Sequence, residues 1–299
     1  HHFPYYNIQC LDKIQMSRMP ADLAAFEGTL AFRGTPDSVY LLARLWELTN
    51  TRYVLGPAGY LETLNGQLDP AQRRFRIVQA FNVVPKPGIA QPTRLEEFTA
   101  VTADNGGYAL FEFTGALPRV KLYANWQVST NDPVKLQAWL AGLQPYLPPE
   151  TYGILNSLPA TDQATLQTLA DTNFVPGGTV LVSRPLPDSS TTNENPGTVE
   201  FTSYAPKHIV LRAQTAAPCV LLLNDRYDPQ WSVRVDGQPA ELLRCNYIMR
   251  GVYLTPGQHT VEFNFTLPNQ PLYITLTAIG VGILLSGFLF VTGRRKSAG

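Results

Sequence analysis

Charged side chains are scarce in this sequence. Asp, Glu, Lys and Arg make up only 15% of the 299 residues, and the formal net charge is zero. Proteins that bind nucleic acid usually carry a basic patch that neutralises phosphates. Because no basic excess is present, we expect no nucleic-acid partner. An apolar fraction of 44% with 25 prolines indicates a folded, loop-rich chain and not a disordered one.

Cysteine is rare as well. Cys10, Cys219 and Cys245 are too few for a disulfide scaffold, and their spacing matches no zinc signature. Cys219 and Cys245 fall on neighbouring predicted strands. They either pair in an oxidising compartment or stay as two free core thiols, and the sequence leaves both possibilities open.

Signatures of catalysis and metal binding are missing. The chain has no Gly-x-Ser-x-Gly elbow, P-loop or dinucleotide fingerprint. Glu96 and Glu97 are adjacent and point apart on a helix or strand, which argues against a paired-carboxylate glycosidase site. The run 104–107 lacks the later Glu of a calcium loop, and His208 and His259 are isolated. We therefore predict no catalytic residue, no metal site and no cofactor in this chain.

The chain opens with His1-His2-Phe3-Pro4, without an initiator Met or a signal sequence. We interpret it as a piece of a longer protein. The histidine pair is alternatively the remainder of a tag, although Phe-Pro-Tyr-Tyr looks native.

One long apolar run lies near the C-terminus. Leu272–Thr292 contains no charge and has about the 20 residues that a helix needs to cross a bilayer. Arg294, Arg295 and Lys296 follow it at once, whereas no basic residue lies just before it. The positive-inside rule then puts residues 293–299 in the cytoplasm and everything before the span outside. We expect a membrane protein with a single C-terminal span at 272–292, which for a bacterial source is an inner-membrane protein.

The first part of the chain mixes helix and strand signals, so residues 1–184 are predicted to form a mixed α/β extracytoplasmic domain. Expected helices are 37–48, 133–143 and 161–169, the second with Asp132 as its cap and Pro133 in its first turn. Expected strands are 51–56, 76–81, 108–113, 120–128 and 179–182. The run 185–197, rich in Pro, Ser, Thr and Asn, is interpreted as a linker.

The second part is almost purely β. Residues 198–267 contain seven strand-length runs, which predict an antiparallel β-sandwich and an α+β chain overall. The runs are 199–204, 208–213, 219–223, 231–235, 240–244, 247–254 and 260–265. Asp236-Gly237 and Pro256-Gly257 supply hairpin turns between them.

Three segments of this second part resemble one protein family. They are 227–237, with Tyr-Asp-Pro-Gln-Trp and Val-Asp-Gly; 244–252, with Asn-Tyr-Ile-Met-Arg-Gly; and 256–263, with Pro-Gly-Gln-His. In this order, before an apolar run and a basic end, they resemble the C-terminal region of YfhO-like bacterial membrane proteins, which are akin to C-type glycosyltransferases. The upstream runs 45–55 and 118–123 look similar too, so the resemblance covers most of the chain.

The resemblance implies an enzyme of the cell envelope that uses a lipid-linked sugar. Its partners would be the lipid bilayer, a polyprenyl-phosphate sugar and a glycan acceptor. The family's catalytic acid lies in an early loop between membrane helices, and no such loop is present in this sequence. The resemblance therefore assigns no catalytic residue here. A non-enzymatic, membrane-anchored module that binds a glycan or a protein is the alternative.

Three residues are the candidates for substrate binding. Tyr227 and Trp231 are candidates for an aromatic platform under a sugar ring, with Tyr247 as a further aromatic, although aromatics on sandwich strands more often lie in the core. Arg250, with Arg234 as a second choice, suits the phosphate of a polyprenyl carrier. Solvation or pairing with Asp225 or Asp236 is the ordinary alternative for these arginines.

Overall fold

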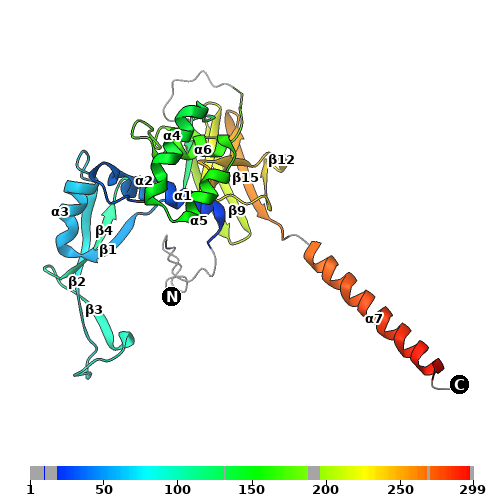
Figure 1. Ribbon diagram of the computed structural model, residues 1–299. Coiled ribbons are helices and arrows are strands. Elements are labelled where there is room, and N and C mark those ends of the chain that lie inside the picture. Colours follow the sequence, from blue (N-terminus) through cyan, green and yellow to red (C-terminus); the bar gives the residue numbers. More distant parts are fainter. Residues whose placement is uncertain (1–9, 11–18, 131, 188–195, 268–269, 297–299) are drawn as a thin grey trace.

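The computed structural model describes residues 10, 19–130, 132–187, 196–267 and 270–296 (Figure 1). The His1-His2 pair and most of the predicted linker lie outside the described residues. The described chain is a mixed α+β structure whose larger sheets are antiparallel, as the sequence predicts.

A small sheet with the strand order β1-β4-β2-β3 forms the first unit of structure. Its strands are β1 (Tyr53–Pro57), β2 (Phe75–Pro85), β3 (Phe98–Thr102) and β4 (Tyr108–Phe113). One face packs against α2 (Tyr40–Leu48) and the turns η3 (Ala58–Tyr60), α3 (Leu61–Thr63) and η4 (Leu64–Leu68), around Phe75, Phe111 and Phe113. Strand β3 was not predicted.

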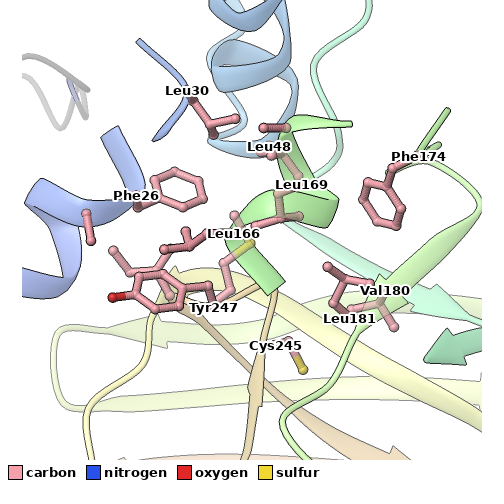
Figure 2. Close-up of a cluster of buried hydrophobic side chains, with 14 of the residues drawn as sticks. Phe26, Leu30, Leu48, Leu166, Leu169, Phe174, Val180, Leu181, Cys245 and Tyr247 are labelled. Atoms are coloured by element: carbon pink, nitrogen blue, oxygen red, sulfur yellow. The ribbon is translucent and has the colours of Figure 1, made fainter. Parts of the chain in front are cut away.

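A helical layer covers the middle of the molecule. It contains α1 (Ala21–Thr29), η2 (Pro36–Ser38), α2, α4 (Pro133–Leu143), η6 (Gln144–Tyr146), α5 (Pro149–Ser157) and α6 (Ala160–Ala170). The predicted cap is confirmed, since Asp132 accepts a hydrogen bond of 2.7 Å from the Val134 N–H. The apolar faces of these helices meet strands β6 (Asn125–Gln127) and β7 (Thr179–Leu181), together with Cys245 and Tyr247 (Figure 2).

Two facing sheets build the predicted sandwich. One has the order β13-β14-β10-β5 and the other β12-β11-β15-β9-β8. The strands are β5 (Val120–Tyr123), β8 (Gly197–Ala205), β9 (His208–Thr215), β10 (Cys219–Arg226), β11 (Trp231–Val235), β12 (Gln238–Ala240), β13 (Leu243–Cys245), β14 (Met249–Leu254) and β15 (Gly257–Phe265). Alternate side chains of both sheets, among them Leu211, Leu221 and Phe263, form one buried core.

Two predicted strands are each divided in two. The run 120–128 splits into β5 and β6, and the run 240–244 splits into β12 and β13. In both cases the chain moves from one sheet to another, so the two halves bond to different neighbours. Apolar patterning reports burial and does not show at which residue the chain changes sheets.

The sandwich is not built from residues 198–267 alone. Strand β5, from the part of the chain before the predicted linker, pairs with β10 in the register Tyr123 to Val220. The core under the helical layer likewise joins Leu166 and Leu169 to Cys245 and Tyr247 (Figure 2). Strand pairing and core packing therefore both cross the predicted boundary at 185–197.

Cys219 and Cys245 are both buried and unpaired. The alternative of a disulfide between them is therefore wrong for this structure. Burial raises the pKa of the Cys219 thiol to about 12 and raises the pKa of the Cys245 thiol as well.

Helix α7 (Gln270–Lys296) leaves the body after β15 and extends away from it (Figure 1). The predicted span at 272–292 falls inside this helix, and its side chains are described from Tyr273 to Ser286. Within the described residues, no helix has both the length and the apolar character that a membrane crossing requires.

Candidate binding site

An open pocket of about 290 Å³ lies at one end of the sandwich. It is lined by Tyr204, Pro206, Ile209, Asp225, Arg226, Asp228, Trp231, Arg250 and Phe265. These residues come from both sheets and from the turn between β10 and β11, so the sandwich fold itself brings them together. We name this cavity the Trp231 pocket.

Two strands place the aromatic wall of the Trp231 pocket. Trp231 opens β11 and lies opposite Phe265 at the end of β15, and their ring centroids are 5.3 Å apart. The turn before Trp231 is fixed by Asp228, whose carbonyl accepts from the Trp231 N–H at 3.0 Å and whose carboxylate accepts from the Gln230 N–H at 2.8 Å. The indole therefore sits at the mouth of the sandwich and is half-buried against the core, which lies between the platform and the core position that the sequence left open.

Arg250 forms the floor of the pocket. Its side chain is only 3% exposed and donates to the Asp225 carboxylate and to the Arg226 carbonyl, both at 2.9 Å. The guanidinium lies 3.8 Å from the centroid of the Trp231 ring, within the range of a cation–π contact. Burial lowers the pKa of Arg250, and the Asp225 carboxylate opposes that shift.

A second arginine completes the polar cluster. Arg119 donates to the Asp225 carboxylate at 2.8 Å and to the Tyr204 hydroxyl, and its guanidinium lies 4.3 Å from the Tyr204 ring. Asp225 thus holds two arginines, one on the pocket floor and one beside its wall. This network fixes the side chains before any ligand arrives, which reduces the entropy lost on binding.

The lining combines apolar ring faces with carboxylate and guanidinium groups. A sugar has apolar C–H faces and a ring of hydroxyls that both donate and accept hydrogen bonds. Trp231 and Phe265 offer apolar surface, and Asp228 and Arg226 offer acceptor and donor groups at the same cavity. The site therefore suits a saccharide unit better than a free anion, because each guanidinium around it already has a carboxylate neighbour.

The candidate residues are only partly brought together. Trp231 and Arg250 share the pocket, whereas Tyr227 does not line it and is held by a 2.7 Å bond from its N–H to the Ile248 carbonyl. Tyr247 is buried under the helical layer (Figure 2), and Arg234 is exposed on β11. The predicted alternative of an Arg250–Asp225 pair is what the structure shows.

Tyr204, Asp228 and Phe265 were missed as site residues. Phe265 ends a strand of alternating apolar and polar residues, which is a local signal for the end of a strand. Asp228 lies in a Tyr-Asp-Pro run, which is a local signal for a turn. Nothing in the sequence shows that the ends of β8 and β15 line the same pocket as the start of β11.

A second, small cavity of about 20 Å³ lies between α6 and β7. Asp162 and Arg244 form an ion pair of 2.9 Å at its edge. The hydroxyls of Ser129 and Tyr247 line the same region without a hydrogen-bond partner in the described structure. The volume accommodates about one water molecule and no substrate.

His208 and His259 make ordinary hydrogen bonds. His259 Nδ1 lies 2.8 Å from Asp236, and His208 Nδ1 lies 2.7 Å from Asn264. In the described part of the chain, no group of three His, Cys, Asp or Glu side chains is placed to hold a metal ion.

No protein-family model, curated protein or solved structure matches this chain. The resemblance to the YfhO-like proteins therefore stays a prediction from the three motif segments. In the structure, these segments form β11, β13 with β14, and β15, and the first two supply Trp231 and Arg250 to the pocket.

Proposed function

We propose that this chain is the extracytoplasmic C-terminal part of a membrane glycosyltransferase-like protein of the bacterial cell envelope, and that the Trp231 pocket binds a saccharide unit. The chemistry of transfer is assigned to a membrane domain outside this sequence. The observation that carries the proposal is the position of the pocket, next to the strand that leads into the apolar helix α7.

Helix α7 supports anchoring in a bilayer. From Tyr273 to Ser286 it contains no charged residue, and its large apolar side chains are exposed along the whole stretch. They are Tyr273, Ile274, Leu276, Ile279, Val281, Ile283, Leu284 and Leu285. An apolar shell on all sides is unfavourable in water and is typical of a helix surrounded by lipid. Arg294, Arg295 and Lys296 favour a cytoplasmic end.

The distance along the chain links the pocket to that anchor. Phe265 lines the pocket and ends β15, and α7 begins at Gln270. Five residue steps span at most about 17 Å when fully extended. A ligand in the pocket is therefore held close to the outer membrane surface, where the sugar of a polyprenyl-phosphate donor, or a glycan acceptor beside it, would be found.

A non-enzymatic binding module is the second candidate. Asp225 favours this candidate, because its carboxylate accepts hydrogen bonds from both Arg119 and Arg250 and thus positions the side chains of the pocket. The gene region upstream of His1 separates the two functions. Eight or more apolar spans with an acidic residue in the first outer loop would support the transferase part, and a signal peptide directly upstream would support the module.

Membrane topology is the first experimental test. In right-side-out spheroplasts, added protease should digest the part before Leu272, while a reporter fused after Gly299 stays protected. A protected body with a digested reporter would reverse the topology and overturn the envelope role.

Sugar binding is the second test. The full chain in detergent is applied to an array of envelope saccharides and to vesicles that contain polyprenyl-phosphate sugars. Asp228→Ala and Trp231→Phe should each weaken binding by about tenfold, the effect of one lost polar or aromatic contact. Asp104→Ala, in an exposed turn away from the pocket, is the control. Equal binding by all four proteins would place the saccharide elsewhere.

A further inference from the structure

The hairpin of β2 and β3 projects from the small sheet as a two-stranded arm (Figure 1). Strand β4 pairs with β2 only as far as Phe81, so the strand pairing of residues 82–85 is with β3 alone. We name residues 82–101 the β2–β3 arm. An isolated two-stranded ribbon is marginally stable in water and is usually stabilised by contact with another surface.

The arm exposes large apolar side chains on both faces and at its tip. Val83 and Val101 belong to opposite faces, because Val83 pairs with Ala100 and Val101 with Asn82. Both are about half exposed, and Leu95 at the tip is 90% exposed. Polar residues would be expected at these positions if the arm stood only in water. The arm therefore has the character of a contact element.

Charges at the tip compensate one another. The Glu97 carboxylate accepts from the Thr93 and Arg94 N–H groups, and Arg94 lies 4.0 Å from Glu96. Because these charges cancel, the tip has no net charge that would attract an oppositely charged protein. An uncharged apolar partner is therefore favoured. Leu95 stands out of this compensated loop as the most exposed large apolar side chain of the described residues.

The direction of the arm favours one kind of partner. In Figure 1 the arm and α7 both extend toward the lower side of the view, whereas α4 and α6 lie at the opposite side. From this we infer that the β2–β3 arm is a second membrane contact, with Leu95 inserted at the lipid interface of the bilayer that holds α7. The inference rests on the proposed anchoring, and a second contact beside α7 would limit the tilt of the Trp231 pocket over the membrane.

The test uses the full chain in phosphatidylcholine vesicles with an environment-sensitive nitrobenzoxadiazole label. In a Cys10→Ser background, single labels are placed at Leu95→Cys, Ile283→Cys and Val134→Cys; the last is an exposed position on α4 and serves as control. Lipids with a nitroxide at shallow or deep positions then quench each label.

The Leu95 label should shift to shorter wavelength and lose at least about twofold in emission with shallow nitroxide lipids, while the Val134 label stays unchanged. Quenching at Ile283 but not at Leu95 would overturn the arm contact and leave the anchor intact. No quenching at Ile283 would overturn the anchor itself. A blue-shifted Leu95 label without lipid quenching would mean that the arm touches protein, which also overturns the inference.

Discussion

The Arg250 guanidinium lies 3.8 Å from the centre of the Trp231 ring, and the Asp225 carboxylate accepts a hydrogen bond from the same guanidinium at 2.9 Å. One face of the ring is therefore covered by a cation that is itself buried and paired. The same contacts therefore stabilise the end of the sandwich and shape the Trp231 pocket. Substitutions of these residues should be tested both for the free energy of unfolding and for ligand binding.

Removal of the Asp225 charge should destabilise the protein. Asp225→Asn leaves Arg250 buried without its counter-charge and costs about 2–4 kcal/mol, somewhat less than a fully enclosed pair because Asp225 keeps some exposure. Asp228→Asn in the same pocket lacks such an ion pair and should change stability by about 0.5 kcal/mol or less. Urea unfolding of the full chain in detergent measures both, and equal effects would contradict the role of the buried pair.

Truncation of Trp231 should cost less than loss of a fully buried indole. Because the ring is half-buried, Trp231→Ala should destabilise by about 1–3 kcal/mol, against about 3–5 kcal/mol for an enclosed aromatic. Trp231→Phe should keep most of the packing against Phe265. Thermal melts decide the matter, and an unchanged melting temperature for Trp231→Ala would show that the ring contributes nothing to the fold.

Two glycines should respond to substitution for different reasons. Gly237, at φ 76° after Asp236 at φ 53°, forms the predicted hairpin turn in open space, so Gly237→Val costs about 1–2 kcal/mol of backbone strain.

At Gly251 an added methyl would lie 2.6 Å from the Leu221 carbonyl and 2.8 Å from the Cys245 sulfur. Gly251→Ala should therefore cost about 1–3 kcal/mol through overpacking. A Gly251→Ala protein as stable as the parent would disprove the close contact.

Stability should fall at alkaline pH because of the buried thiols. Burial raises the pKa of Cys219 to about 12, so between about pH 9 and pH 12 the unfolded chain loses this proton while the folded chain retains it. The unfolded state then binds fewer protons, and stability decreases by about 1.4 kcal/mol per pH unit from this group. Cys219→Ala should flatten that slope in urea unfolding, whereas Cys10→Ala should leave it unchanged. An identical slope in both variants would assign the effect to other groups.

Much of the sandwich follows from local signals in the sequence. Val261, Phe263 and Phe265 alternate with polar residues along β15, and Asp236-Gly237 marks the two-residue turn between β11 and β12. Such patterns depend on neighbours within a few residues, and they located the strands of the second half, except that the single run 240–244 covers parts of two strands, β12 and β13. The Asp132 cap of α4 was predictable for the same reason.

The parts that escaped prediction depend on residues far apart in the chain. Arg119 meets Asp225 and Tyr204 only because β5 joins β10 and β8 joins the facing sheet. A single sequence without strand order does not contain that information. Trp231 and Arg250 could be proposed one by one from their residue types, but their stacking on each other could not.

The pairing of β5 with β10 joins two strands that are synthesised far apart in time. Tyr123 emerges from the ribosome about 100 residues before its partner Val220, which corresponds to roughly 5–20 s at ordinary elongation rates. During that time an apolar strand edge has no partner and is open to wrong pairing with another nascent chain. A product terminated between the two strands would keep this edge unpaired permanently, so premature stops there should yield aggregates that proteases remove.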